Sequence, residues 1–378
     1  MRAIRKIRRG SVLVIVMITL LFATAALLLF MEKASVDLLV EQREAVARRL
    51  RVEAYSALEV TLAVLNEFRT AGNGLRNPAE GWSDPLAFAG YQPGDDRTVE
   101  VVFDDESGKL SLPHTNAIVL TNLFRGWGVS ESDAEAVADA LLGWMKHGHV
   151  YTSALRPRYD SASPAFDPPG RPLRSFAELA AIERVRELLY DPDGRPNDLW
   201  KRFVAAVSLL DFRQPNINGA KPDTLAALGQ FDPSQQQRLD EYFRGAGAYQ
   251  GRGPQFVQNP NEVQRIAGPA GDSSGFATTI SALRVTVTVR DGRTEFRLSA
   301  VVAPPGGATT VHKTATPAVV RPSAAKSSAQ QQSAPNAAQA AGTAKNAGTA
   351  ASLRYPFTLL EIRENDEIPP PPPPPAGP

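Results

Sequence analysis

Apolar residues form an uninterrupted run near the start of the chain, from Ser11 to Met31. The run holds no charged side chain and is about 21 residues long, so as a helix it would cover roughly 30 Å, the thickness of a bilayer's hydrocarbon core. Residues 2–9 before it carry Arg and Lys but no acid. This basic flank predicts a single membrane pass with the amino terminus in the cytoplasm and the remainder of the chain outside.

The helical pattern does not stop at Met31. Apolar residues recur at helical spacing as Val36, Leu39, Val40, Val46, Leu50, Ala54, Leu58, Leu62 and Leu65. No Gly or Pro interrupts them before Gly72, which predicts one continuous helix over about 11–70, near 90 Å long. Its first half would lie in lipid and its amphipathic second half would pack on a domain. The competing interpretation, a cleavable secretory signal, would have a shorter apolar core and a small-residue site before the charges at Glu32 and Lys33.

Strand patterns lie on both sides of a long helical stretch. Residues 98–103 and 109–112 are joined by an acidic turn, which predicts one hairpin. Residues 283–289 and 294–302 alternate around Asp291-Gly292, a strong signal for a second hairpin. The expected fold class is α+β, in which the long transmembrane and amphipathic helix packs on a small antiparallel sheet. A large, mostly helical domain, about 113–270, is inserted between the strands.

Two related units are predicted within the helical stretch. The first covers 108–124 and then Glu131–Trp144, and the second covers 214–231 and then Pro233–Phe243. Each runs from an extended segment through an Asn-containing turn into two helices. Asn116, Asn216 and Asn218 suit turns and caps, because their side chains can bond nearby backbone amides, and Pro222 suits the first turn of a helix.

The end of the chain has a different composition. Residues 303–351 are rich in Ala, Ser, Thr, Gln and Pro, which predicts a disordered linker. Arg354–Arg363 gathers aromatic and aliphatic residues again, and Pro369–Pro375 should be extended. The segment could add as a strand to a partner, or to the sheet of its own domain, or simply cover an edge of that domain; the sequence leaves these open.

Composition and charge exclude several classes of function. Lys and Arg total 41 against 40 Asp and Glu, so nucleic acid is not an expected partner. The chain has no cysteine, which excludes disulfides, thiol nucleophiles and Cys-based metal sites. Gly126-Trp127-Gly128 resembles a helix–hairpin–helix turn that could meet a phosphate, but residues 113–270 hold about as many acids as bases. No catalytic triad, phosphate loop or nucleotide fingerprint is present, so no enzyme is expected.

One loop has the oxygen-rich composition that calcium prefers. Asp191, Asp193 and Asp198 are its candidate ligands, although the spacing departs from that of an EF-hand and a capped helix start explains the same residues. His147 and His149 could form half of a metal site, but no third ligand lies nearby and a surface loop is the favoured interpretation. No cofactor is therefore assigned, and calcium is kept only as a candidate.

The basic leader, Gly10, the uncharged helix and its amphipathic continuation together resemble the type IV pilin and pseudopilin family. The resemblance implies that prepilin peptidase cuts between Gly10 and Ser11 and that Ser11 is then methylated. Most members carry Glu at the fifth mature position, where this chain has Ile15. A carboxylate in lipid needs a partner, which the family finds in the terminal amine of the preceding subunit. Ile15 therefore favours a tip or initiating subunit, the alternative being that it is only a membrane residue.

Further segments resemble the type II secretion protein K family, GspK. They are Gly108–Leu112 with Ala138–Trp144, Pro164–Leu179, and PNINGAKPDTLAAL at 215–228. The similarity spans roughly 5–302, and protein K is also the member that lacks the fifth-position Glu. Gly219 stands where the family usually has Thr, and Gly143 where it has Asp. The resemblance also implies calcium in the inserted domain, but its ligands do not map onto this sequence by motif.

The sequence patterns and the resemblance together predict the following organisation. Residues 1–10 form the leader, 11–71 the pilin-like helix, 72–112 and 271–302 a pseudopilin α/β domain, 113–270 the insert, 303–351 the linker and 352–378 a docking segment with a polyproline tail. The implied function is that of a minor pseudopilin in the inner membrane, with its globular part in the periplasm. It would initiate or cap the pseudopilus of a type II secretion system and associate with other minor pseudopilins and the major pseudopilin. The alternatives are a tip pilin of a type IV pilus or DNA-uptake apparatus, and a signal-anchored periplasmic domain unrelated to filaments.

Overall fold

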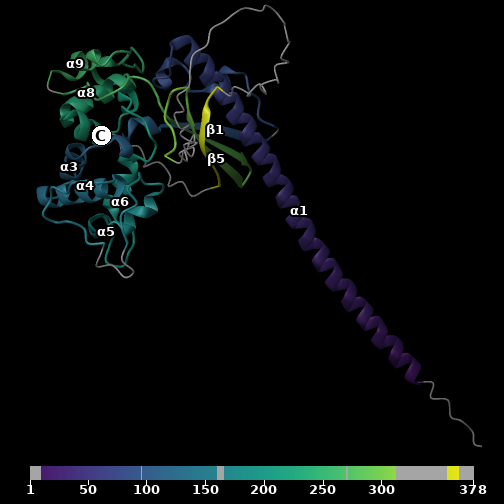
Figure 1. The fold of residues 1–378 in the computed structure, drawn as a ribbon. Coiled ribbons are helices and arrows are strands. Elements are labelled where there is room, and N and C mark those ends of the chain that lie inside the picture. The colour runs from purple at the N-terminus through teal and green to yellow at the C-terminus, as the bar shows by residue number, and fades with distance from the viewer. Residues whose placement is uncertain (1–9, 95, 160–165, 270, 312–355, 366–378) are drawn as a thin grey trace, which may run out of the picture.

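The computed structural model describes residues 10–94, 96–159, 166–269, 271–311 and 356–365. Helix α1 (Gly10–Gly72) is one unbroken helix of 63 residues, about 95 Å long at 1.5 Å per residue, and it stands out from the head as a rod (Figure 1). It ends where Asn73 and then Gly74 take positive φ and the Gly74 amide donates to the Arg69 carbonyl. The prediction of a single helix is confirmed.

A four-stranded antiparallel sheet forms the centre of the head, in the order β1-β4-β5-β6. The strands are β1 (Arg97–Asp105), β4 (Leu283–Asp291), β5 (Thr294–Ala303) and β6 (Thr358–Glu364). Strands β4 and β5 form the predicted hairpin, in which Asp291 pairs with Thr294 and Gly292 has a φ of +56°. The C-terminal segment, whose partner the sequence left open, pairs with β5 of its own chain.

The other predicted hairpin, between residues 98–103 and 109–112, is wrong. Strand β1 pairs along its whole length with β4, while β2 (Leu110–Ser111) pairs in parallel with β3 (Val207–Ser208) in a separate two-stranded sheet. The physical reason lies in the turn, where the Asp105 side chain caps the 3-10 turn η2 (Glu106–Gly108). This cap directs the chain out of the sheet instead of back along β1.

The second half of α1 lies on one face of the sheet and supplies half of its core. Its buried residues follow the predicted helical spacing, and all are 4% exposed or less: Leu50, Ala54, Ala57, Leu58, Leu62 and Leu65. They pack against the inward-facing residues of the sheet, Val285, Val287, Val289, Leu298, Ala300 and Val302. Apolar residues recur about every 3.6 residues on the helix and every second residue on the strands, so each element has one apolar face, and these two faces pack together.

The chain between β1 and β4 forms the insert, which is mostly helical as expected. In Figure 1 the insert lies on one side of the sheet, and helix α1, which we call the stem, lies on the other. Its α-helices are α3 (Ala117–Gly126), α4 (Glu131–Met145), α5 (Glu183–Leu189), α6 (Asp198–Ala206), α7 (Pro222–Gly229), α8 (Pro233–Arg244) and α9 (Asn261–Ala267). After η2, the insert also contains the 3-10 turns η3 (Leu112–His114), η4 (Phe176–Ala181), η5 (Ile217–Gly219) and η6 (Gly247–Tyr249). Two short elements precede β1 in the chain, η1 (Pro78–Glu80) and α2 (Pro85–Phe88). The α+β fold class is confirmed.

The two related units in the insert each consist of a 3-10 turn followed by a pair of helices. In the first, the side chain of Asn116 accepts from the Val119 amide and caps α3. In the second, Asn216 caps η5 instead, and α7 starts at Pro222. Helices α3 and α7 pack against each other, so the two units meet through their first helices.

Candidate assembly site: the stem helix and its junction with the head

The first part of α1 presents apolar side chains on every side. The stretch of this helix that is apolar enough to cross a membrane has no buried residue. Within the described residues, α1 is the single helix that is long and apolar enough to do so. The polar side chains between Leu13 and Met31 are Thr19 and Thr24, and both hydroxyls donate to backbone carbonyls one turn earlier. Because each hydroxyl donates its proton within the helix, the cost of placing it in lipid is reduced.

The predicted processing and assembly residues lie at the start of this helix. Gly10 is the first residue of α1, and residues 1–9 of the leader lie outside the described part of the chain. Cleavage between Gly10 and Ser11 therefore stays a prediction. Ile15 is 60% exposed in the middle of an apolar surface, so its side chain faces the surroundings of the helix and not the head.

A second stretch of the stem, residues 32–45, lies between the apolar run and the head. It is exposed and carries charges of both signs, with Arg48 paired to Glu44 at 2.9 Å just before the first packed turn. Apolar side chains are also exposed there, at Val36, Leu38, Leu39 and Val40. At 1.5 Å per residue this stretch holds the head about 20 Å from the apolar run.

The stem is fixed to the head by polar contacts on both flanks of its buried stripe. On the β1 side, Glu53 accepts from Tyr91 Oη at 2.5 Å and from Arg97 Nη1 at 2.7 Å. On the β6 side, Arg51 Nε and Tyr55 Oη donate to Glu364 at 2.9 and 2.6 Å. Hydrogen bonds from Tyr55 and Arg51 hold the pKa of Glu364 below its ordinary value. These contacts fix the rotation of the helix on the sheet.

A second attachment, which we call the junction, joins the insert to the sheet through the carboxylate of Asp105. Its Oδ1 accepts from the Ser107 amide and hydroxyl at 2.9 and 2.6 Å, and its Oδ2 accepts from Asn216 Nδ2 at 2.7 Å. Ser107 Oγ in turn accepts from the Ser281 amide at 2.9 Å, and Asn216 Nδ2 also donates to the Arg76 carbonyl at 2.9 Å. Four segments distant in sequence are thus bonded to one another at the point where the insert leaves and rejoins the sheet.

The charges around the junction are arranged unevenly. Asp104 is paired with Lys221 at 2.7 Å, and Glu106 is paired with Arg284 at 2.7 Å and with Lys109 at 2.9 Å. Within the described chain, no Lys or Arg is bonded to Asp105, which lies between these two paired acids. Burial raises the pKa of Asp105 to about 6, and the hydrogen bonds from Ser107 and Asn216 oppose the rise only in part.

Two glycines allow the close approach at the junction. A Cβ on Gly219 would overlap the Asp105 carboxylate, and a Cβ on Gly108 would overlap the carbonyl of Gly219. The Gly219 position, where the resembled family usually has Thr, therefore has no room for a side chain here. Gly143 is crowded in the same way by Tyr151, whose ring lies where a Cβ would point.

The predicted calcium ligands are not brought together. Asp193 pairs with Arg195 at 3.3 Å and Asp198 pairs with Lys201 at 2.9 Å, while the Asp191 amide closes a turn to the Arg195 carbonyl. No group of three or more His, Asp or Glu in the described residues is placed to hold a metal ion. The capped-turn interpretation agrees with this geometry, since Asn197 caps α6.

One residue of the histidine pair, His149, is a partner of the buried Asp139. His149 Nε2 lies 3.0 Å from Asp139 Oδ1, and Asp139 Oδ2 accepts from the amides of Thr152 and Ser153 at 2.7 and 2.6 Å. Burial disfavours the charge on Asp139, but the hydrogen bonds from Ser153, His149 and Thr152 outweigh it and lower the pKa. Asp139 therefore organises the loop after α4.

The sequence indicates that Asn216 is a turn or cap residue but not that it contacts Asp105, because the two residues are far apart in sequence. The acidic run at 104–106 was assigned to a hairpin turn, although Asp followed two residues later by Ser is also the pattern of a local cap. A cap of this kind indicates that the chain leaves the sheet at Asp105.

No protein-family model matches this sequence, and no curated protein matches it. Among solved structures, this chain is similar to a chain of the GspK-GspI-GspJ complex of the type 2 secretion system from enterotoxigenic Escherichia coli. The alignment covers 71% of this chain and 96% of that chain, with 13% sequence identity and a TM-score of 0.46.

Proposed function

We propose that this protein is a minor pseudopilin at the tip of a type II secretion pseudopilus, where it initiates or caps assembly for export across the outer membrane. The observation that carries the proposal is α1. The helix is apolar and exposed over a membrane thickness and then continues without a break into the core of the head. A simple membrane anchor has no need of such a rigid connection, whereas a filament subunit has.

The proposed location follows from the basic residues before Gly10. They keep the amino terminus in the cytoplasm, the apolar run spans the inner membrane once, and the head lies in the periplasm. Prepilin peptidase would cut after Gly10, and methylation of Ser11 would follow. The partners would be the other minor pseudopilins and the major pseudopilin, and the work would be assembly without a reaction of the protein's own.

Ile15 and the insert support a place at the tip. An apolar side chain at position 15 suits lipid and needs no amine from a preceding subunit. The insert adds bulk at the head end of the stem, away from the apolar run (Figure 1). A subunit of this shape leaves little room for another head to be added above it.

Mass analysis of the mature amino terminus tests the proposal most directly. The protein purified from membranes of cells that contain prepilin peptidase should begin at a methylated Ser11, and the protein from cells without the peptidase should keep its leader. A Gly10→Arg variant is the matched control and should remain uncut in both. A mature protein that begins with Met1 in peptidase-containing cells, or that lacks everything through Met31, would contradict the proposal.

The place in the filament needs its own measurement. Antibody labelling of isolated pseudopili should mark one end only, while labelling of the major subunit should mark the whole shaft. Label spread along the shaft would show a subunit of the filament body and would remove the tip assignment while leaving the pseudopilin assignment in place.

The DNA-uptake alternative is separated by a binding assay on the detergent-solubilised chain. At the α3–α4 turn, Arg125 lies 3.5 Å from Glu131, and Arg202, whose guanidinium lies over the Trp127 ring, is paired with Asp223, so both cations beside the Gly126-Trp127-Gly128 turn are partly neutralised. We therefore expect no binding of double-stranded DNA at low salt. Salt-dependent binding that is lost in an Arg125→Ala variant would favour the uptake apparatus.

A further inference from the structure

The outer edge of β5 has the character of an interior strand. From Phe296 onward its residues are almost all buried, and the final run Leu298–Ala303 is apolar apart from Ser299. A strand of this kind, left at the edge of a sheet, would expose a row of unpaired backbone groups beside apolar side chains. The edge of β5 therefore requires an occupant.

In this structure the occupant is β6, which is held by its ladder with β5 and by one side-chain contact at each end. The ladder runs from the Leu298–Glu364 pair to the Ala303–Thr358 pair, with a bulge between Val301 and Val302. Just before β6, Phe357 is 3% exposed and inserts into the core beneath the stem. At the other end Glu364 accepts from Arg51 and Tyr55 of α1. An aromatic anchor, a backbone ladder and an ionic anchor together specify which segment fits this edge.

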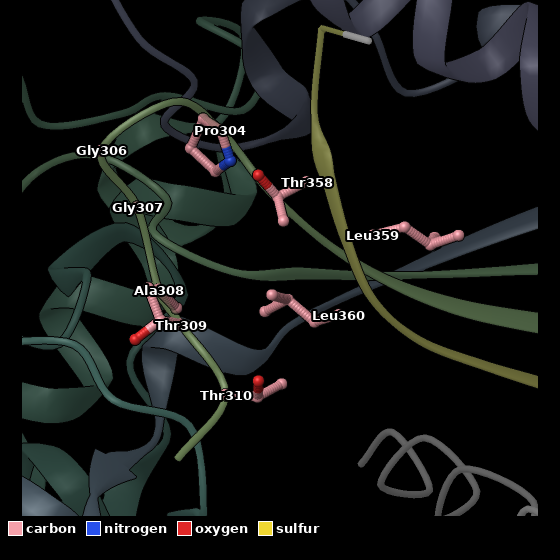
Figure 2. Close-up of a pocket in the computed structure, with 9 residues that line it drawn as sticks. All are labelled: Pro304, Gly306, Gly307, Ala308, Thr309, Thr310, Thr358, Leu359 and Leu360. Atoms are coloured by element: carbon pink, nitrogen blue, oxygen red, sulfur yellow. The ribbon is translucent and has the colours of Figure 1, made fainter. Parts of the chain in front are cut away.

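Between its two end contacts, β6 has apolar side chains that are exposed on its surface. Leu359 and Ile362 are 43% and 39% exposed. A cavity of about 380 Å³ separates the loop after β5 from the first residues of the strand, and it is lined by Pro304, Gly306, Gly307, Ala308, Thr309, Thr310, Thr358, Leu359 and Leu360 (Figure 2). Leaving the edge would break the ladder, withdraw Phe357 from the core and remove Leu360 from the apolar cluster of Phe212, Ala282, Val301 and Ala303 against which it packs.

The connection to the rest of the chain does not force β6 onto its own sheet. Residues 312–355 separate it from the last residue of the loop after β5. At no more than about 3.6 Å per residue, those 44 residues can span up to about 150 Å. A second copy of the chain offers the same edge in the same register, so pairing within one chain and between two chains uses identical contacts. Only the effective concentrations differ.

We propose that the β5 edge is a strand-acceptor site that takes residues 356–364 of a second copy of this chain as well as its own, so that neighbouring heads exchange their C-terminal strands. The proposal does not depend on the filament assignment. Anchoring in one membrane would favour the exchange, since it raises the concentration of one copy beside another.

The absence of cysteine from the chain makes a clean test available. Ser299 and Arg363 are directly opposite in the β5–β6 ladder, at a separation that an engineered disulfide can bridge. Two full-length variants, Ser299→Cys and Arg363→Cys, are co-expressed in the same cells and oxidised in the membrane. Since each chain holds one cysteine, a disulfide between the two different variants forms only when the strand of one copy lies on the edge of another.

We expect a disulfide-linked pair of unlike chains on a non-reducing gel, with the linkage between positions 299 and 363 verified by peptide mass analysis. Three controls accompany it. The double variant Ser299→Cys/Arg363→Cys should close the bond within one chain. Ser299→Cys with Thr358→Cys, which is out of register, should give little linkage. Adding Phe357→Ala to the chain that carries Arg363→Cys should lower the yield several-fold, because the aromatic anchor is lost.

Two results would overturn the proposal. If the double variant closes its bond but the mixed pair gives only monomers, the strand stays on its own chain. If neither forms a bond, or if the out-of-register pair links as well as the matched one, then β5 does not accept this segment in the stated register.

Discussion

The sheet is joined to the stem and to the insert by different kinds of interaction. Under the stem, aliphatic side chains such as Leu58 and Leu62 are buried against valines of β4 with few polar groups among them. At the junction, Asp105, Ser107 and Asn216 are bonded through charges and amides, and two glycines permit contact between backbones. Apolar packing tolerates small shifts and is insensitive to pH, whereas buried hydrogen bonds fix one geometry and respond to protonation. The stem is thus attached mainly by packing, with polar contacts at its flanks, whereas buried hydrogen bonds fix the insert at the junction and a smaller apolar cluster around Phe212 supports it.

The largest effect is expected from truncation of the apolar core. Leu62 is 1% exposed, so Leu62→Ala should lower the free energy of unfolding of the head by about 2–5 kcal/mol. Leu28→Ala is the matched control on the same helix, since Leu28 is 68% exposed in the membrane run, and it should leave the head unchanged. Urea denaturation of the full chain in detergent measures both. Equal losses of unfolding free energy in the two variants would show that the stem is not divided into an exposed apolar run and a half that packs in the core of the head.

Protonation of Asp105 should affect the junction and not the core. Its folded-state pKa of about 6 lies above the ordinary value of 3.8, so its contribution to stability is complete below pH 3.8 and is lost as the pH rises through 6. Relative to Asp105→Asn, which does not titrate, the wild-type advantage in unfolding free energy should fall by up to about 3 kcal/mol between pH 4 and pH 7. The Leu62→Ala difference should stay constant over the same range. A wild-type advantage over Asp105→Asn that is flat, or that grows with pH, would contradict the assignment.

Substitution of two capping asparagines compares the buried junction with an ordinary helix cap. Asn216→Ala removes the donor to Asp105 and leaves the Arg76 carbonyl without its partner, which should lower the unfolding free energy by about 1–3 kcal/mol. Asn116→Ala removes a similar cap at an exposed position and should cost less, about 1 kcal/mol. Both are measured by urea denaturation. The junction would lose its special role if the two variants proved equally stable.

The smallest effect is expected at the ionic contact on the rim of the stem interface. Glu364→Gln weakens the contact with Arg51, whose side chain is 57% exposed, so salt screens the pair. Thermal unfolding should detect a slight loss at low salt and none at high salt. Glu44→Gln, which breaks the exposed pair with Arg48 on the same helix, provides the comparison. A large loss that persists in high salt would mean that β6 contributes more to holding the stem than its exposure indicates.

Local patterns predicted the elements, and distant contacts decided how they pair. The stem was predictable because its apolar period has no Gly or Pro to interrupt it, and the β4–β5 hairpin because Asp291-Gly292 permits only a tight turn. The β1–β2 hairpin failed because β4, about 180 residues further along, offered a longer partner than the four residues that follow the turn. The junction could not be inferred, since Asp105 and Asn216 are 111 residues apart and no local pattern relates them.

Because one unbroken helix runs from Gly10 into the core, no flexible connection lies between the apolar run of the stem and the head. A pull or a twist applied at the membrane end travels along the helix axis and reaches the sheet at Leu50 without a hinge that could absorb it. A force that translates or turns this helix as a whole would therefore move the entire head by the same step.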